Sequence, residues 1–139
     1  MGHISPDILA HLFSYAALLK LSLAKQLGLN TSQLLALMLI GSIKGVSIKA
    51  LRKKLSIPGS SLTFTIDSLE KKKLIKRQRS REDRRQWLLS LSAKGEQLYA
   101  EILKEEREAI SPALEKLSDA EKATFLKLAE EIVKAGTTD

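Results

Sequence analysis

The spacing of apolar residues changes at Leu74, and this change limits the folds that the chain can adopt. Upstream, apolar residues recur at intervals of three and four, as on one face of a helix: Leu62, Ile66 and Leu69. Downstream, residues 74–79 and 87–91 are typical of two short strands around the polar loop 80–86. The sequence therefore predicts a helix followed directly by a β-hairpin with a charged tip.

A shorter helix is predicted immediately before this one. Ser47 can cap it, and its apolar residues share one face. Its basic residues lie elsewhere on the helix: Lys49, Arg52, Lys53 and Lys54. A tight Pro-Gly break at residues 56–60 then separates the two helices. This is the helix-turn-helix arrangement, whose second helix enters the major groove of DNA with its N-terminal residues toward the base edges.

Four further helices complete the predicted fold. The first begins at Ser5, a good capping residue, and the second opens at Asn30 with Gln33 in the capping-box position. The last begins at a similar pattern, Ser118 to Glu121. The expected ranges are about 5–26, 34–43, 93–110 and 118 onward. We therefore expect a mainly α fold, a winged helix-turn-helix with a two-stranded wing and long N- and C-terminal helices.

The long terminal helices are expected to form a dimerisation region. The first carries apolar residues around most of its circumference, more than one face against a single core requires. We predict a single domain over residues 1–139, with a DNA-binding lobe at 29–92 and dimerisation helices at 5–27 and 93–135. The predicted partner for these helices is a second copy of the chain, giving a homodimer.

Positive charge is concentrated in one part of the chain. The net charge is +7, and residues 71–85 alone hold nine basic and two acidic residues. Such a cluster next to a helix-turn-helix favours a polyanionic partner, because each neutralised phosphate releases counterions. The basic residues that we expect to contact DNA on this ground are Lys49, Arg79, Arg81 and Arg84.

Several other functions are not expected from this sequence. It has no cysteine, and His3 and His11 have no metal-ligating partner at a suitable spacing, so we expect no metal site and no cofactor. No motif of a known catalytic site is present, and we expect no enzyme activity. The longest uninterrupted apolar run, Leu34–Ile40, is far shorter than a membrane span. We expect a cytoplasmic protein without a membrane partner.

The residues from Arg81 to Gly95 resemble the wing motif of a known family, the multiple antibiotic resistance regulators (MarR). That motif has Asp, any residue and Arg, then a strand that ends in Leu, Ser or Thr, two residues and Gly; here it corresponds to Asp83-Arg84-Arg85 and Leu91-Ser92-Ala93-Lys94-Gly95. Residues 29–33, 55–57 and 60–75 are similar to the family's helix opening, turn and recognition helix. The resemblance implies a dimeric DNA-binding transcriptional regulator, a repressor of a double-stranded DNA operator.

The resemblance also implies roles for particular residues. The groove-facing side of the recognition helix would carry Ser60, Ser61, Thr63 and Phe64. Arg85 would reach into the minor groove, whose narrow parts attract arginine, and Asp83 would hold it by a salt bridge. Members of the family commonly respond to small aromatic or phenolic effectors. The resemblance implies an effector pocket here near Tyr15, Leu18 and Leu19.

The chain departs from the family pattern at two positions that affect these expectations. Phe64 stands where a basic or polar residue is common, so a contact with a thymine methyl replaces a guanine contact. Lys73 stands where glycine is common, and this puts the geometry of the turn in question unless Lys73 avoids a positive φ.

Two alternative functions fit the same sequence features. A structural DNA- or RNA-binding protein could use the basic wing without recognising sequence, and it would bind specific and random duplexes within a few-fold. A winged-helix module for protein interaction would carry the charge incidentally and would lack affinity for DNA.

Overall fold

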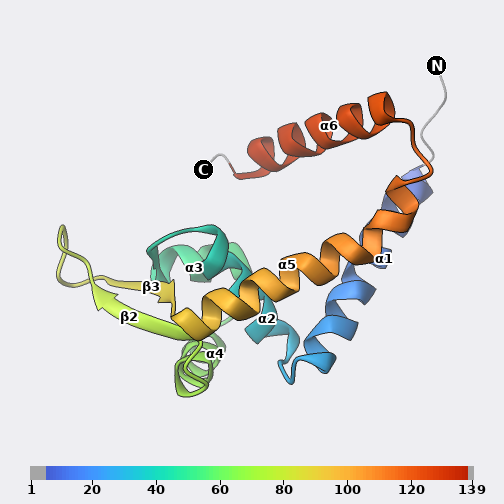
Figure 1. The fold of residues 1–139 in the computed structure, drawn as a ribbon. Coiled ribbons are helices and arrows are strands. Elements are labelled where there is room, and N and C mark those ends of the chain that lie inside the picture. The colour runs from blue at the N-terminus through green and yellow to red at the C-terminus, as the bar shows by residue number, and fades with distance from the viewer. Residues whose placement is uncertain (1–5, 138–139) are drawn as a thin grey trace. The chain divides into compact units, whose positions relative to one another are not determined.

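The computed structural model describes residues 6–137, and its elements follow the predicted order with one added strand (Figure 1). The elements are α1 (Pro6–Gln26), α2 (Thr31–Ser42), β1 (Val46–Ser47), α3 (Ile48–Leu55), α4 (Gly59–Lys71), β2 (Ile75–Arg79), β3 (Trp87–Leu91), α5 (Ala93–Leu114) and α6 (Asp119–Thr137). The mainly helical winged fold is confirmed. The predicted cap at Ser5 and the histidine His3 lie outside the described residues.

The chain divides into two compact units, residues 1–103 and 104–139. Within its described part, the first unit holds α1 to α4, the sheet and the first half of α5. The second holds the rest of α5 and α6. The predicted division into a DNA-binding lobe and dimerisation helices is a functional division and stays a prediction.

Local capping signals fix where the helices begin. At α2, the Asn30 backbone N–H donates to Gln33 Oε1 at 2.9 Å, and the Gln33 backbone N–H donates to Asn30 Oδ1 at 2.8 Å. At α3, Ser47 Oγ accepts a bond from the Ala50 backbone N–H at 3.1 Å. These side chains satisfy backbone donors that have no partner inside the first turn. Both predicted caps are confirmed.

The wing is a β2–β3 hairpin that belongs to a three-stranded antiparallel sheet of order β1-β3-β2. In the hairpin, Ile75 pairs with Leu91 and Arg79 pairs with Trp87. On the other side of β3, Val46 pairs with Leu89. Strand β1 was not predicted, because a strand of two residues has no periodicity and its partner lies more than 40 residues away.

The core of the first unit is centred on α2, which packs against α1, α3, α4 and β3. The largest fully buried side chains come from α2, α3, α4, β3 and α5: Leu34, Leu37, Ile40, Leu51, Leu62, Ile66, Leu69, Leu89 and Ile102. Each buried leucine or isoleucine stabilises the fold by about 1.5–3 kcal/mol. The core therefore holds α4 and the wing on one frame.

The junction between the wing and α5 depends on Ser92 and Gly95. Ser92 Oγ donates to the Lys73 carbonyl at 2.6 Å and accepts from the Gly95 backbone N–H at 3.0 Å. A Cβ atom on Gly95 would lie 1.9 Å from the Leu74 carbonyl oxygen, so no side chain fits there. The Ser-x-x-Gly part of the motif therefore caps α5 and lets it approach the turn before β2.

The surface of α1 is unusually apolar for a helix of a monomer. Its exposed large apolar residues are Ile8, Leu9, Leu12, Phe13, Tyr15, Leu18 and Leu21. An 18-residue stretch within residues 7–26 has a mean hydropathy of 1.3, which by length and composition alone would suffice to cross a membrane. The expectation of no membrane span was based only on the length of uninterrupted apolar runs, which does not reflect the mean hydropathy of α1. The described part of α6 also exposes large apolar side chains: Phe125, Leu126, Leu128, Ile132 and Val133.

Candidate nucleic-acid interface

The first half of α4 presents a solvent-facing side whose opposite side is buried in the core. Leu62, Thr65 and Ile66 are at most 3% exposed, whereas Phe64 is 70% exposed. The predicted groove-facing residues all lie on the exposed side: Ser60, Ser61, Thr63 and Phe64. A large aromatic side chain left this open on a helix is available for an apolar contact with a partner.

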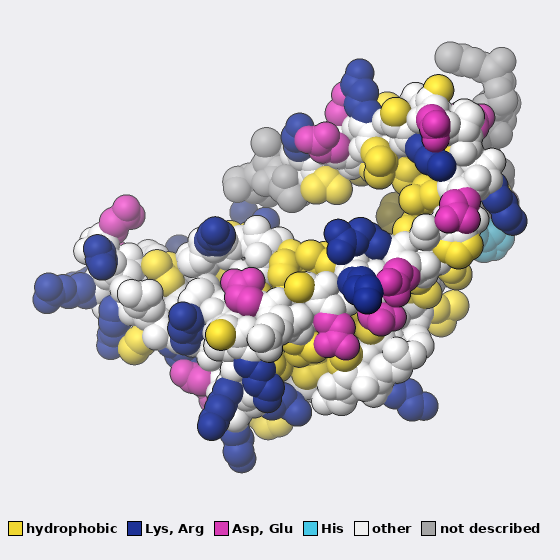
Figure 2. Space-filling model, viewed as in Figure 1, with side chains coloured by type: hydrophobic (Ala, Val, Ile, Leu, Met, Phe, Trp, Pro, Cys, Tyr) yellow, Lys and Arg dark blue, Asp and Glu magenta, His cyan; other side chains and the backbone are white. Residues whose placement is uncertain are grey.

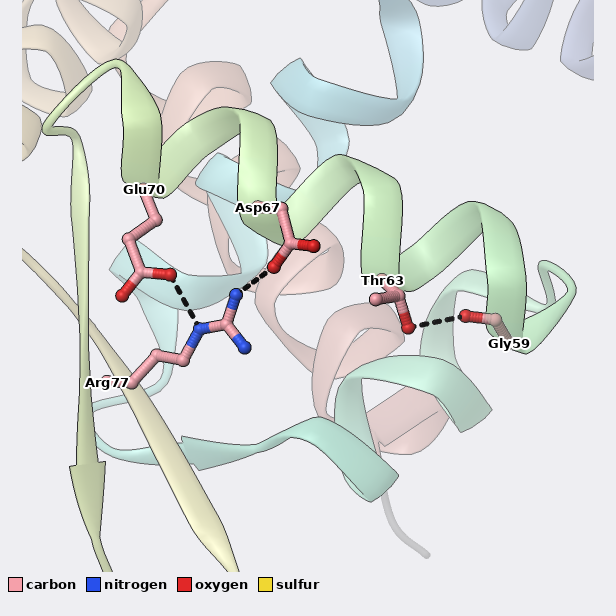
Figure 3. Close-up of polar contacts among 5 residues, drawn as sticks. All are labelled: Gly59, Thr63, Asp67, Glu70 and Arg77. Carbon is pink, nitrogen blue, oxygen red and sulfur yellow. Dashed lines mark hydrogen bonds and ion pairs between the residues drawn. The ribbon is translucent and has the colours of Figure 1, made fainter.

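The start of α4 differs in detail from the expectation. The break between the helices was expected over residues 56–60, but the N-cap is Pro58 and the helix begins at Gly59, so Ser60 is its second residue. Thr63 Oγ1 donates a hydrogen bond to the Gly59 carbonyl at 3.0 Å (Figure 3). The Thr63 hydroxyl hydrogen is therefore engaged, and the methyl group and the oxygen lone pairs remain for a partner.

The tip of the wing is an ordered loop built around Ser80. This buried residue accepts hydrogen bonds at Oγ from the backbone N–H groups of Glu82 and Asp83, both at 3.2 Å. Its own N–H donates to the Gln86 carbonyl at 3.0 Å. The loop holds three exposed arginines: Arg81, Arg84 and Arg85.

The contact between Asp83 and Arg85 is not the salt bridge that the resemblance implied. Asp83 Oδ1 accepts a hydrogen bond from the Arg85 backbone N–H at 2.9 Å. A carboxylate two residues before a backbone N–H closes a local turn of this kind readily. Asp83 therefore shapes the loop. Its carboxylate binds the backbone of Arg85 and not the exposed guanidinium.

Arg79 makes two contacts within the wing. Its Nη1 donates to the Arg84 carbonyl at 2.6 Å, and its guanidinium carbon lies 4.2 Å from the centre of the Trp87 ring. The strand register places these two side chains directly opposite each other. Trp87 thus packs against the Arg79 side chain. The sequence analysis assigned Arg79 to DNA contact, and these bonds give it a structural task as well.

Two surface hollows show which predicted residues lie together. One is lined by Arg79, Ser80, Arg81 and Arg84 on the wing. Another joins the start of α3 to the wing and is lined by Ser47, Ile48, Lys49, Arg85, Gln86 and Trp87. Lys49 and Arg85, which are 36 positions apart, thus share one site. In Figure 2, lysine and arginine side chains gather around the wing and α4.

Sequence reasoning missed the parts that Arg52 and Gln86 play in this surface. Together with Lys49 and Lys53 they line a further hollow between α3 and the wing. The Arg52 guanidinium also covers Gly59, since its Cζ lies 3.4 Å from the position of a Cβ there. Arg52 was counted among the basic residues of its helix, but nothing in the spacing indicated that it reaches the start of α4.

The three residues of the expected effector pocket lie on α1. Tyr15 is 49% and Leu18 is 63% exposed, and Leu19 is half-buried. Among residues 6–137, no group of three or more His, Asp or Glu side chains is placed to hold a metal ion.

A family model identifies the part of the chain that carries this surface. The model of the MarR family matches residues 27–86, which include α2, α3, α4, β2 and the tip of the wing. The matched residues assign this part of the chain to the MarR family of winged helix-turn-helix transcriptional regulators, a family that is not enzymatic.

Solved MarR structures share the fold over nearly the whole chain. A mutant MepR from a multidrug-resistant S. aureus isolate is 19% identical, with a TM-score of 0.81, and the match covers 96% of this chain and 99% of MepR. A Listeria monocytogenes protein complexed with 26mer DNA is 26% identical, with a TM-score of 0.70 and coverage of 98% and 89%. FabT from Streptococcus pneumoniae in complex with DNA is 21% identical, with a TM-score of 0.70 and coverage of 92% of each chain. A comparison with curated proteins gave no significant match.

Proposed function

We propose that this MarR-family regulator is a homodimeric repressor that binds a specific double-stranded DNA operator, with α4 in the major groove and Arg85 in the minor groove. One observation carries the proposal: a single core fixes both the exposed first half of α4 and the arginine-bearing wing tip. Two MarR-fold proteins have been solved with DNA, which agrees with this use of the fold.

The exposed side chains of α4 favour particular base contacts. Serine hydroxyls at positions 60 and 61 can donate to or accept from base edges. Thr63 and Phe64 offer a methyl group and a ring, both of which suit the C5-methyl group of thymine. We therefore expect an operator half-site with thymine opposite Phe64.

The wing supplies charge and minor-groove contact. Arg85 shares a hollow with Lys49 of α3, so the two cations can meet the same stretch of backbone. Each phosphate contact makes the slope of log K against log salt more negative by about 0.9. Binding should therefore weaken steeply as salt is raised.

The exposed apolar residues of α1 and α6 are proposed to meet a second copy of the chain. Phe13 is 71% and Ile132 is 72% exposed, too open for apolar side chains without a partner. A symmetric dimer would place its two half-sites roughly 34 Å apart, one turn of DNA. Sedimentation should give twice the mass of the chain, with the protein in the soluble, cytoplasmic fraction. A monomer, or protein found with membranes, would contradict this assignment of α1.

A small aromatic or phenolic effector is proposed to relieve repression by binding near Tyr15, Leu18 and Leu19. These apolar side chains and the phenol of Tyr15 suit an aromatic ring with a polar substituent. Titration with an aromatic carboxylic acid should release the operator from the wild type but not from Leu18→Asp. Release of both proteins alike would place the effector elsewhere.

Selection of bound sequences from a random duplex pool tests the proposal. Wild type should yield a twofold-symmetric site. Arg85→Ala should lower affinity for all sequences, because it removes a contact with the backbone and groove, whereas Ser61→Ala should change the preference at one defined position. Identical selected sequences from all three proteins, with equal affinity, would refute these roles.

A further inference from the structure

We propose that Arg77 is a positioning residue that fixes the recognition helix α4 against the wing, and that it acts through Asp67 and Glu70 and not on DNA. The inference rests on the proposed DNA-binding function. It changes the role of one basic residue in the cluster 71–85, which the sequence alone assigned as a whole to a polyanionic partner.

The guanidinium of Arg77 lies between two carboxylates of α4 (Figure 3). Its Nη2 contacts Asp67 Oδ1, and its Nε lies 2.8 Å from Glu70 Oε2. The Nε atom is buried, and its contact with Glu70 is an ion pair without the alignment of a full hydrogen bond. A planar guanidinium can engage two carboxylates at once, which a lysine ammonium does less rigidly.

The strand pattern directs Arg77 toward α4. Side chains alternate between the two faces of a strand, so Arg77 shares a face with the buried Ile75, and Lys76 lies on the opposite face. The Arg77 side chain is only 26% exposed, whereas Lys76 is exposed. The neighbouring basic residues Lys76 and Arg77 therefore have different roles.

The pair of contacts controls how α4 is presented. Gly59, Thr63 and Asp67 follow one another at intervals of four along α4, so holding Asp67 fixes the rotation of the face that carries Thr63 (Figure 3). Asp67 and Glu70 are 57% and 43% exposed, and without Arg77 their charges would repel phosphates. Arg77 both orients the helix and offsets these charges.

The charge of the two carboxylates makes a sharp test possible. Neutralising them with Asp67→Asn/Glu70→Gln removes repulsion of DNA, so simple electrostatics predicts tighter binding. If they hold Arg77 in place, the same variant should bind the selected duplex about tenfold more weakly, equivalent to about 1.4 kcal/mol. Its affinity for a scrambled duplex should stay equal or rise, since the freed arginine remains cationic. The measured quantity is the ratio of the two affinities, at a temperature where a thermal melt shows each variant folded.

A double-mutant cycle with Arg77→Gln separates positioning from direct contact. In the wild-type background this change should lower specific affinity about tenfold, and in the Asp67→Asn/Glu70→Gln background it should lower it no more than Lys76→Gln does. Lys76→Gln is the matched control, because it removes one positive charge from the same strand and should have the same effect in both backgrounds.

The outcomes distinguish the inference from the proposed function. An equal loss from Arg77→Gln in both backgrounds, or specific binding by the neutralised variant as tight as wild type, overturns the positioning role. If Arg77→Gln does not fold, the affinity ratio of the neutralised variant decides alone. A wild-type protein without preference between the two duplexes would instead overturn the proposed function, and the inference with it.

Discussion

The Asp83 carboxylate accepts a hydrogen bond from the backbone N–H of Arg85 at 2.9 Å, and this bond closes the tip of the wing. Together with Ser80, it sets the path of the backbone that carries the exposed arginines. Asp83 of the wing motif therefore fixes the loop conformation, and it affects the position of the Arg85 guanidinium only through that conformation.

This contact predicts different outcomes for two substitutions of Asp83. Asp83→Asn keeps an oxygen acceptor at the same place, so DNA affinity should stay within about twofold of wild type. Asp83→Ala removes the acceptor, and the loss of a hydrogen bond worth about 0.5–1.5 kcal/mol should weaken binding about threefold to tenfold. Fluorescence anisotropy with a selected duplex measures both. An equal loss for Asn and Ala would favour the salt bridge over the loop contact.

Lys73 occupies a left-handed conformation, with φ of 60°. The turn therefore keeps a positive φ although the glycine common at this position is missing. Such a conformation costs a residue with a Cβ about 1 kcal/mol or more. Lys73→Gly should raise the free energy of unfolding by about 0.5–1 kcal/mol, after the greater freedom of glycine in the unfolded chain is taken into account. Urea denaturation measures this change.

Lys72→Gly serves as the control for that prediction. Lys72 has φ of −73°, so glycine relieves no strain there and should lower stability. Stabilisation by both substitutions would show that lysine charge, and not backbone conformation, is responsible.

Gly95 should tolerate no side chain. In Gly95→Ala the new Cβ would lie 1.9 Å from a backbone carbonyl oxygen, and the shift of α5 that this requires should cost about 3 kcal/mol. Gly136→Ala is the matched control, because nothing lies within 4 Å of a Cβ there and alanine favours helices by up to about 1 kcal/mol. Thermal unfolding should give a lower Tm for the first variant and an equal or higher Tm for the second. Equal Tm values would contradict the close approach.

The start of α6 should respond to acid. The Ser118 backbone N–H donates to Glu121 Oε2 at 2.8 Å, and this bond, with the Ser118 side chain, lowers the pKa of Glu121. A lowered folded-state pKa contributes stability that is present above the unfolded value and is lost as the pH falls through the folded value. The protection of the first-turn amides of α6 against hydrogen exchange, taken relative to the intrinsic exchange rate at each pH, should therefore fall on acidification. Glu121→Gln should remove this dependence, and an unchanged dependence in that variant would point to another group.

Local signals in the sequence predicted the parts of the fold that depend on neighbouring residues. Asn30 with Gln33, and Ser118 with Glu121, cap helices through bonds only three residues long, and both were predicted. The hairpin followed from the change in periodicity at Leu74. The burial of the polar Thr65, on the side of α4 that faces the core, did not follow from these local signals.

The parts that the sequence could not predict depend on contacts between distant residues. The ion pairs of Arg77 join α4 to β2, and the hollow shared by Lys49 and Arg85 joins α3 to the wing. In the sequence, nothing distinguishes Arg77 from the other basic residues of the cluster 71–85. Only the direction of its side chain on the strand distinguishes it from Lys76.

If α4 and the wing of each subunit together recognise one DNA sequence, a competition experiment at physiological salt should reveal a strong preference for it. Labelled selected duplex is bound by wild type and displaced by unlabelled selected or scrambled duplex. We expect a preference for the selected duplex of about 10³-fold or more. A preference of only a few-fold would contradict it and favour a structural nucleic-acid-binding protein that does not recognise sequence.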